Sequence, residues 1–472
     1  MKATGTTPSS TVTKQLTVVA SRRRKLEEKY AKRVVVDEAL ARQLVSYQGN
    51  KSEPFFRWYR YKEAFSAALV SQLLEDEDIP LKGHLLDPFA GMGTSLFMAG
   101  QRGLQADGIE LLPVGSTVIR TGILMGLSLE PGDLDAVRRW LRIRPWASDG
   151  TALRINELAI TRGAYPEETR AQIGRYLALL MGETSSARLI LLTVLLSVLE
   201  NVSFTRKDGQ YLRWDHRAGR RHGLGGFEKP DIQSFDAAIM AKLTQVAEDI
   251  VGFEQRSMPG ANRVSLFEGS CFDVLPRLRG DYYDVVLTSP PYCNRYDYTR
   301  TYALELALLG SGERELKSLR QQLLSSTVEN RPKLLSNMNN DWSEPVNDAL
   351  DQPLLKSILA YLEGMQSEGL LNNSGIPRMV RGYFSEMSCV IFECYRVLKP
   401  GGVMLMVNDN VKYSGVNIPV DLILSDIAEA QGFEVRRIRV LPKAKGNSSQ
   451  QMSTFGRDPL RKCVYVWRKG NA

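Results

Sequence analysis

The chain has 472 residues, of which 43% are hydrophobic and 24% are charged, and its formal net charge is +8. No apolar run in the sequence reaches the roughly 18 residues that a membrane span needs. The N-terminal stretch also lacks the apolar centre of a signal peptide, so we expect a cytoplasmic protein without a membrane partner. The five cysteines form no CxxC pair and only three histidines are present, so we expect no metal site. The positive charge is a weak sign of a polyanionic partner.

The N-terminal segment, residues 1–53, is basic and has two parts. Residues 1–20 are rich in Thr and Ser, which predicts disorder, and residues 21–50 are predicted to be helical. The stretch FFRWYRYKEAFSAALVSQLLEDEDIP then begins with aromatic residues. It becomes an amphipathic helix, because Phe65, Leu69 and Leu73 share a face.

A β-α-β unit is predicted next. Leu85 and Leu86 end a short buried strand, a glycine-rich turn follows, and TSLFMAGQRG forms a helix that ends at Gly103. The second strand, QADGIEL, ends in the carboxylate of Glu110. The unit therefore carries a glycine turn at its first strand end and an acid at its second.

The rest of the chain alternates between α/β stretches and helical ones. Strands are predicted in residues 263–311 and again after residue 381, where the last two, EVRRIRVLP and KCVYVWRK, could pair antiparallel. Strands that alternate with helices predict a doubly wound, mostly parallel sheet. Such sheets bind ligands at the carboxyl ends of their strands, where the unusual motifs of this chain fall. We therefore expect these motifs to converge in one crevice.

The stretch DPFAGMGT contains Gly91 and Gly93, which allow a tight turn and a close approach of a ligand to the main chain. It is not a P-loop, because Gly-Lys-Ser/Thr is missing, and it is not a complete GxGxxG motif. The functional interpretation of this turn depends on Glu110, because a carboxylate at the end of the next strand fits the two hydroxyls of a ribose. A purely structural turn is the alternative.

The stretch EGSCFDVLP follows another predicted strand. Asp273 could accept a hydrogen bond from an adenine amino group while Phe272 packs against the ring. The alternative role for Asp273 is to cap the short helix that follows.

The stretch DVVLTSPPY is a buried strand that stops at two prolines, which offer no N–H to a sheet. Ser289 and the carbonyl groups around Pro290 and Pro291 therefore form a small cluster of acceptors. Such a cluster suits the two hydrogens of a planar amino group, and Tyr292 supplies a flat face on which a base can stack. Catalysis would then depend on positioning and preorganised hydrogen bonds.

A basic, aromatic-containing loop between residues 206 and 221 suits contact with phosphates. A solvated surface loop is the alternative. We expect this loop to contact nucleic acid through Arg206, Lys207, Arg213, Arg217, Arg220 and Arg221. We expect a further contact from Arg300, which follows the SPPY stretch. The alternative for Arg300 is that it only takes part in a helix cap.

At these residues the sequence resembles the S-adenosylmethionine-dependent DNA methyltransferases that modify exocyclic amino groups. DPFAGMGT resembles their FxGxG motif, and TSPPY resembles their catalytic D/N/S-P-P-Y/F/W motif. Lys62 and Phe65 fall where the family has a Lys-Phe pair that closes over the methionine part of the cofactor, although here Glu63 and Ala64 separate them. The resemblance implies catalytic roles for Ser289, Pro290, Pro291 and Tyr292. It implies that S-adenosylmethionine is bound by Lys62, Phe65, Asp87, Pro88, Phe89, Gly91, Gly93, Thr94, Glu110, Phe272 and Asp273.

The resemblance also implies a class I methyltransferase fold with a seven-stranded sheet and helical insertions. The core would comprise residues 54–112, 263–311 and 381–472. The insertions would be residues 113–262 and 312–380, and one of them would recognise the target. The basic loop favours the first, whereas the amides of NMNNDWSEP in the second could also read base edges.

The implied reaction is methylation of the N4 amino group of a cytosine flipped out of duplex DNA, because serine begins the catalytic motif most often in cytosine-N4 members. A bacterial restriction-modification or phage-defence context follows from the resemblance, with a restriction endonuclease or other defence protein as partner. The alternatives are an adenine-N6 DNA enzyme, an RNA base-amino methyltransferase and a non-catalytic nucleic-acid-binding protein.

Overall fold

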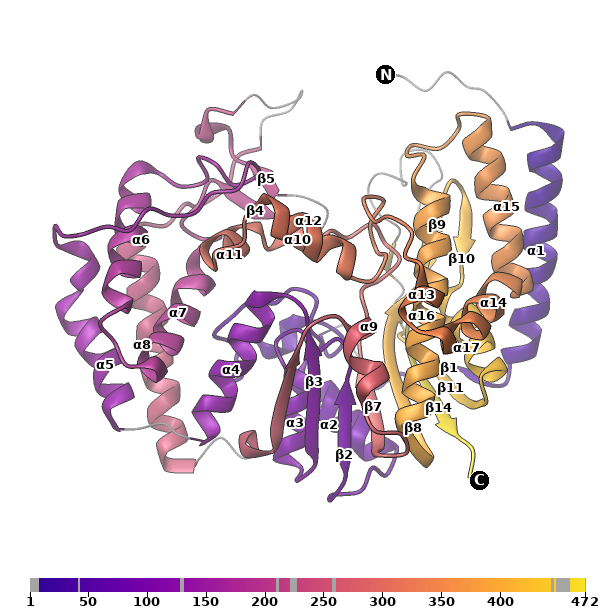
Figure 1. Cartoon of the computed structure of the whole chain (residues 1–472), viewed down its shortest axis with the longest axis horizontal. Coiled ribbons are helices and arrows are strands. Elements are labelled where there is room, and N and C mark those ends of the chain that lie inside the picture. The colour runs from indigo at the N-terminus through magenta and orange to yellow at the C-terminus, as the bar shows by residue number, and fades with distance from the viewer. Residues whose placement is uncertain are drawn as a thin grey trace.

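The computed structural model describes residues 8–40, 43–127, 131–208, 212–220, 227–256, 260–442, 445–446 and 459–471. At its centre lies an eight-stranded sheet in the order β1-β11-β14-β8-β7-β2-β3-β6 (Figure 1). The strands are β1 (Val34–Val36), β2 (His84–Asp87), β3 (Gln105–Glu110), β6 (Val264–Glu268), β7 (Tyr283–Thr288), β8 (Leu398–Asp409), β11 (Phe433–Val440) and β14 (Lys462–Lys469). Among these described strands, neighbours run parallel except where β14 pairs antiparallel with β8 and β11. The predicted doubly wound, mostly parallel sheet is confirmed, as is the antiparallel pairing of the last two long strands.

The predicted count of seven strands is wrong, because β1 adds an eighth at the edge of the sheet. Three consecutive valines form this strand, and Val34 pairs with Ile438 of β11. The helix predicted over residues 21–50 therefore ends at Tyr30. β-Branched residues such as valine favour a strand. The three valines lie only a few residues after the basic helix, so the periodicity of the sequence does not show where the helix ends and the strand begins.

The disorder predicted for residues 1–20 is also wrong from residue 10 onward, because helix α1 (Ser10–Tyr30) begins there and Ser9 caps it. Its buried residues Val12, Val19 and Leu26 recur every seven positions, and the helix packs against α15 (Pro353–Ser367). Threonines and charged residues fill the positions between them, so the overall composition of the segment is polar although one face of the helix is apolar. Residues 1–7 lie outside the described residues.

Two hydrophobic cores lie on the two faces of the sheet. Leu85 and Val285 point into the core shared with helices α2 to α8, and Leu86 and Val286 point into the core shared with α1 and α14 to α17. Successive side chains of a strand point to opposite faces, so continuous apolar runs give strands that are buried on both sides. The predicted amphipathic helix is confirmed as α2 (Ala67–Asp76), which Ser66 caps.

Most of the remaining helices belong to the two segments between the strands of the core. Between β3 and β6 are α4 (Pro113–Leu127), α5 (Pro131–Ile143), α6 (Glu167–Leu180), α7 (Ser185–Val198), α8 (Phe235–Arg256) and the hairpin β4–β5 (Thr205–Lys207, Leu212–Trp214). Between β7 and β8 are α10 (Tyr298–Thr301), α11 (Ala303–Leu308), α12 (Glu313–Gln322), α13 (Leu335–Met338), α14 (Ser343–Asp351), α15 and α16 (Ile376–Val397). Figure 1 shows α5 to α8 as a helical body beside the β6 edge of the sheet, linked to it by α4, which packs against both α7 and β6.

The other short elements complete the chain. They are α3 (Thr94–Gln101), α9 (Cys271–Val274), α17 (Val420–Ala430), the hairpins β9–β10 (Val411–Tyr413, Val416–Ile418) and β12–β13 (Lys445–Gly446, Pro459–Leu460), and the 3-10 helices η1 (Tyr47–Asn50), η2 (Pro145–Ala147), η3 (His216–Ala218), η4 (Ala261–Arg263), η5 (Leu275–Arg277) and η6 (Asn340–Trp342). The order of the sheet reverses at β2, since the chain continues to β3 and β6 on one side and to β7 and β8 on the other. Ligands bind at such a reversal, beyond the carboxyl ends of the strands.

Candidate active site

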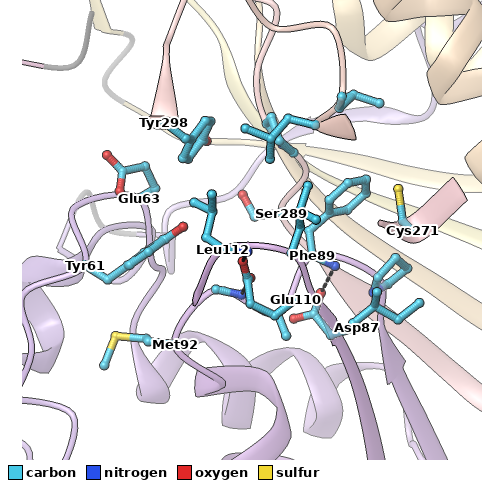
Figure 2. Close-up of a pocket in the computed structure, with 18 of the residues that line it drawn as sticks. Tyr61, Glu63, Asp87, Phe89, Met92, Glu110, Leu112, Cys271, Ser289 and Tyr298 are labelled. Atoms are coloured by element: carbon cyan, nitrogen blue, oxygen red, sulfur yellow. Dashed lines mark hydrogen bonds between the residues drawn. The ribbon is translucent and has the colours of Figure 1, made fainter. Parts of the chain in front are cut away.

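A cavity of about 760 Å³ lies at the carboxyl ends of β2, β3, β6 and β7 (Figure 2). The cavity, called the first cavity below, is lined from these strand ends, from the segment before α2 and from the end of α12: Tyr61, Glu63, Ala64, Phe65, Asp87, Pro88, Phe89, Ala90, Gly91, Met92, Thr94, Ile109, Glu110, Leu111, Leu112, Gly269, Ser270, Cys271, Ser289, Pro291, Tyr298, Gln322, Leu323 and Leu324. The predicted crevice therefore exists, and most of the predicted cofactor-binding residues meet in it.

The glycine turn forms the floor of the first cavity. Gly91 and Gly93 have φ angles of +59° and +81°, in the left-handed region that favours glycine. A Cβ on Gly93 would lie 2.8 Å from Phe97 and 3.0 Å from Ile119, so glycine is required there for packing as well. The turn leads into α3, whose first N–H groups are open to a ligand.

Glu110 fixes this turn with both of its carboxylate oxygens. One oxygen accepts a hydrogen bond from the N–H of Gly91 and the other from the N–H of Leu112, each at 2.7 Å. Burial raises the pKa of Glu110 to about 7, while the two N–H groups oppose the rise. Each oxygen keeps a further lone pair, so the side chain can still accept hydrogen bonds from a bound diol.

Asp87 connects the glycine turn to the end of β7, the strand that leads to Ser289. Its carboxylate accepts hydrogen bonds from the N–H of Phe89 at 3.0 Å, from the hydroxyl of Thr288 at 2.6 Å and from Ser95. Burial raises the pKa of Asp87 to about 6, and these hydrogen bonds limit the rise. Asp87 lines the cavity, but its oxygens are already used to hold the ends of β2 and β7 together.

At the end of β6 the structure differs from the prediction. Gly269, Ser270 and Cys271 line the first cavity, whereas Asp273 and Phe272 are not among its lining residues. Asp273 is exposed on α9, because the turn ends with Ser270, which caps this helix in place of Asp273. Phe272 points into the core and packs edge-on against Trp342.

A second, larger cavity of about 2120 Å³ adjoins the first. It is lined by Glu38, Leu40, Val45, Ser46, Lys62, Glu63, Ala64, Lys207, Asp208, Ser289, Pro290, Tyr292, Asn294, Tyr296, Tyr298, Asp409, Leu441, Pro442 and Lys462. The two cavities share Glu63, Ala64, Ser289 and Tyr298. Ser289 thus lies where a ligand in one cavity would meet a ligand in the other. Figure 2 shows Ser289 among the residues that line the first cavity.

The turn Ser289–Tyr292, which is the predicted catalytic turn, presents its polar groups at this junction. The Ser289 hydroxyl lies 3.0 Å from the Tyr292 hydroxyl and donates to the Val407 carbonyl at 3.2 Å. Pro291 lines the first cavity and Pro290 the second. The four predicted catalytic residues are therefore together, at the boundary between the two cavities.

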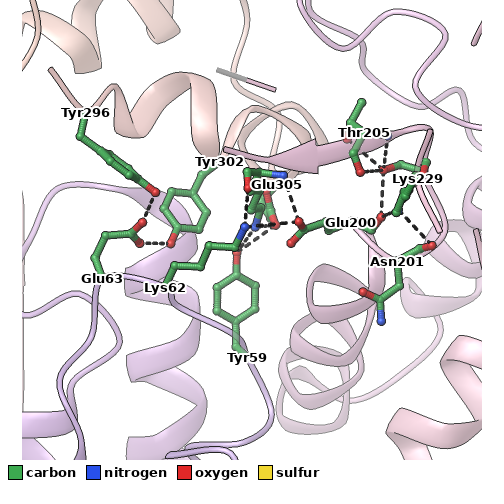
Figure 3. Close-up of polar contacts among 12 residues, drawn as sticks. Tyr59, Lys62, Glu63, Glu200, Asn201, Thr205, Lys229, Tyr296, Tyr302 and Glu305 are labelled. Atoms are coloured by element: carbon green, nitrogen blue, oxygen red, sulfur yellow. Dashed lines mark hydrogen bonds and ion pairs between the residues drawn. The ribbon is translucent and has the colours of Figure 1, made fainter. Parts of the chain in front are cut away.

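Lys62 lines the second cavity rather than the first, and it belongs to a polar network that spans three parts of the chain (Figure 3). Its ammonium donates to the Lys207 carbonyl at 2.5 Å and lies 3.4 Å from Glu200. Beside it, Glu63 accepts hydrogen bonds from the hydroxyls of Tyr296 and Tyr302. Phe65, by contrast, lines the first cavity.

Lys207 is placed differently from the prediction of a phosphate contact. Its ammonium is buried in an ion pair with Glu305 and lies 3.3 Å from the Tyr59 hydroxyl and 4.4 Å from the centre of the Tyr302 ring. Alternation along β4 explains the difference, because Lys207 points inward whereas its neighbour Arg206 is exposed.

The other predicted nucleic-acid contacts fall into two groups. Arg206 and Arg213 face each other across the β4–β5 hairpin and are both exposed. Arg217, however, forms a two-point ion pair with Asp215. Arg220 is also used internally, because it stacks on Trp214 at 3.7 Å and donates to main-chain carbonyls of residues 159 and 162.

Arg300 forms ion pairs with Asp297 and Glu329, both at 3.2 Å. Asp297 also caps α10, which is the alternative that the sequence left open. Arg221 lies outside the described residues.

Sequence reasoning missed several residues that line the two cavities. Asp409 and Lys462 lie beside Tyr292 in the second cavity, and Tyr61 packs against Gly91 while it stacks on Tyr302 at 5.0 Å. The position of Asp409 at the end of a predicted strand was a usable signal. In the part of the chain that the structure describes, no group of three or more His, Cys, Asp or Glu side chains is arranged to hold a metal ion. Nor does any helix there have the length and apolar character needed to cross a bilayer.

A doubly wound sheet with one antiparallel strand, a glycine turn, and an acid at the next strand end together define the class: this is an S-adenosylmethionine-dependent methyltransferase fold. Comparison with known proteins narrows the class. The chain is 49% identical over 448 residues to the type II methyltransferase M.AvaI of Nostoc sp. (strain PCC 7120 / SAG 25.82 / UTEX 2576), covering 94% of this chain and 92% of the relative. The match to M.AvaI of Anabaena variabilis has the same values. The chain is 37% identical over 474 residues to the type II methyltransferase M.BsoBI of Geobacillus stearothermophilus, covering 95% and 92%.

The chain therefore belongs to the family of type II DNA methyltransferases. No protein-family model matches it. A solved structure of a putative sarcosine dimethylglycine methyltransferase from Galdieria sulphuraria aligns over 86% of this chain and 85% of its own, at 10% identity and a TM-score of 0.28, which is too low to support any argument.

S-adenosylmethionine is the methyl donor of this family, and the first cavity fits it. Gly91 brings main chain to the cavity wall, whereas Gly93 shapes the turn but is not among the lining residues. Glu110 retains lone pairs for ribose hydroxyls. The buried hydroxyl oxygen of Thr94 has no hydrogen-bond partner among the described residues and belongs to the cavity lining. These residues would hold the nucleoside, and Tyr61, Glu63 and Phe65 also line the cavity.

Proposed function

We propose that this enzyme methylates the N4 amino group of a cytosine in duplex DNA at a specific sequence. The observation that carries the proposal is the position of Ser289, which lines both cavities. A methyl donor in the first cavity and a base in the second would then meet at the Ser289 hydroxyl. The base would enter the second cavity by rotating out of the duplex, because its amino group is otherwise paired.

The catalytic turn suits an exocyclic amine. Ser289 and the carbonyl of Pro290 are acceptors for the two amine hydrogens, so they would orient the nitrogen with its lone pair toward the first cavity. Tyr292 would stack on the base, which contributes roughly 1–3 kcal/mol. S-adenosylmethionine supplies an electrophilic methyl group, and the nitrogen loses its proton readily once it has been alkylated. Positioning and preorganised acceptors therefore supply most of the catalysis.

Serine, rather than an acid, at the first position of the motif favours cytosine over adenine. This preference rests on the resemblance of TSPPY to the catalytic motif of cytosine-N4 members.

We further propose that the first insertion, residues 113–262, reads the target, and that residues 54–112, 263–311 and 381–472 form the catalytic core. The exposed Arg206 and Arg213 support this choice. In the second insertion, residues 312–380, the Asn339 side chain instead donates to Glu393 of α16, which takes one of the predicted base-reading amides. A bacterial restriction-modification setting, with a cognate endonuclease, is part of the same proposal.

The test is to incubate the purified chain with methyl-labelled S-adenosylmethionine and either duplex DNA or RNA, digest the product to nucleosides and identify the labelled one. We expect N4-methylcytosine from DNA. N6-methyladenine would overturn the cytosine assignment alone, label in RNA only would overturn the DNA substrate, and no label in either would overturn the enzyme. The Ser289→Ala variant, which should still bind the methyl donor, is the control for contaminating activity.

A further inference from the structure

Three neighbouring strands bring a lysine and a carboxylate to the catalytic turn. Lys462, at the start of β14, pairs directly with Asp409, at the end of β8, and their charged groups are 3.4 Å apart. Ser289 follows β7, which pairs with β8 on its other side. The Lys462 ammonium lies 3.3 Å from the Tyr292 hydroxyl and 5.2 Å from the centre of its ring. Both Lys462 and Asp409 line the second cavity.

The hydrogen bonds between these residues can run in one direction only. The ammonium of Lys462 has no lone pair, so it donates to the Tyr292 oxygen. The Val407 carbonyl has no proton, so the Ser289 hydroxyl donates to it. The Tyr292 hydroxyl must then donate to Ser289, which is the bond of 3.0 Å between them. One lone pair of Ser289 accepts this bond and the second remains for a ligand in the cavity.

We propose that Lys462, held by Asp409, is a positioning residue that fixes this donor direction and so keeps an acceptor lone pair of Ser289 free for the amino group of the target base. The proposal rests on the proposed function and deepens it. Without Lys462, the Tyr292 hydroxyl could rotate away from Ser289 and donate to the Asp409 carboxylate instead. The Ser289 hydroxyl would then lose the donor that fixes its orientation and could turn its own hydrogen toward the amine, which would remove the contact that orients the nitrogen.

The charge states of these groups support the direction. Burial opposes the charge on Lys462, but the Asp409 carboxylate and the Tyr292 hydroxyl hold the pKa of Lys462 above its ordinary value. Burial also raises the pKa of Tyr292, with the Lys462 charge opposing the rise, so the phenol keeps its proton. Hydrogen bonds in such a chain strengthen one another, which favours a single orientation.

The experiment is a double-mutant cycle on Lys462 and Tyr292. We expect Lys462→Met and Tyr292→Phe each to lower kcat about tenfold, the effect of losing one hydrogen bond in the reacting state. The dissociation constant of S-adenosylmethionine should be unchanged in both. The double variant should be no slower than Tyr292→Phe alone, because the lysine has no other role once the hydroxyl is absent. Lys469→Met, at the far end of β14 where Lys469 pairs with Asp281, is the matched control and should keep its kcat.

The proposal is wrong if the two single losses of kcat multiply in the double variant. It is also wrong if Tyr292→Phe keeps full activity. The Tyr292→Phe variant retains the aromatic ring, so it tests the hydrogen bonds of the hydroxyl even if Lys462→Met does not fold. A simple structural role would lower thermal stability and binding of the methyl donor together, and would also overturn it. Nucleoside analysis of the wild-type product separates this result from the proposed function. If the product is N6-methyladenine, the double-mutant cycle can still be measured with adenine as the target base. If no product forms, both proposals are wrong.

Discussion

Lys207 and Glu305 form a buried ion pair that joins β4 to α11, the second helix after the Ser289–Tyr292 turn. Their side chains are 3% and 1% exposed, so neither charge has water as an alternative partner. Tyr59, from the segment before α2, bonds to Glu305 at 2.9 Å and so brings a third part of the chain into the contact (Figure 3). The pair therefore sets the position of the basic hairpin relative to the catalytic turn.

Removing one partner of this pair should be costly. We expect Lys207→Met to lower the free energy of unfolding by about 3–5 kcal/mol, because it leaves the Glu305 carboxylate buried without its cation. Chemical denaturation measures the change. Lys207→Met combined with Glu305→Leu should recover much of the loss, whereas equal destabilisation in the single and double variants would contradict a coupled pair. Arg170→Ala, which removes an exposed pair with Glu167 on α6, should leave stability nearly unchanged.

The glycine turn offers a test of the first cavity. Gly91→Val should abolish binding of S-adenosylmethionine, because a Cβ at this position lies 3.3 Å from Tyr61 and the larger side chain would enter the cavity. Isothermal titration calorimetry measures this loss. Ser289→Ala should bind the methyl donor normally while losing transfer, which separates the two cavities.

A matched control for backbone strain exists at Gly163. It has a φ of +73°, and a Cβ there would have no atom within 4 Å. Gly163→Ala therefore carries the strain of a left-handed residue, about 1–2 kcal/mol, without filling the cavity. If Gly163→Ala weakens donor binding as much as Gly91→Val does, the loss at Gly91 reflects strain and the cavity assignment is wrong.

The pH dependence of donor binding should follow Glu110. Its pKa of about 7 means that the carboxylate is mostly protonated in the free protein at pH 6 and mostly ionised at pH 8. The ionised form offers more acceptors to ribose hydroxyls, so affinity should rise with pH, by about tenfold from pH 6 to pH 8 if only that form binds.

Titration calorimetry at several pH values tests this directly. Glu110→Gln should bind weakly and lose the pH dependence, because its amide nitrogen cannot accept from Gly91 or Leu112. Asp87, with a pKa of about 6, titrates nearby. A pH dependence that persists in Glu110→Gln would assign the effect to Asp87 instead.

The sequence predicted those parts of the site that depend on strand ends. Glu110 and Ser289 each follow a short apolar strand, and the parallel sheet brings such ends to one edge. Lys462 could not be found in this way, because only the antiparallel register of β14 against β8 places it opposite Asp409.

Burial explains the incorrect predictions. Lys207 and Arg206 are adjacent cations in the sequence, and only the direction in which each points in β4 separates a core ion pair from a surface charge. Asp273 has the expected chemistry, but it falls two residues beyond the last cavity-lining residue of its turn. The short edge strand β1 was missed for a different reason, because it gains its stability from pairing with β11, which lies hundreds of residues away in the chain.

The exposed arginines of the β4–β5 hairpin provide the test of target recognition. Arg206→Ala and Arg213→Ala should each weaken binding to duplex DNA at all sequences, and each should reduce the salt dependence of binding by about one ion. Fluorescence anisotropy over a salt series measures both effects. Arg217→Ala should instead lower thermal stability, because Arg217 neutralises the buried Asp215. If the salt dependence is unchanged in Arg206→Ala and Arg213→Ala but falls in variants of the second insertion such as Arg331→Ala, the recognition role belongs to residues 312–380.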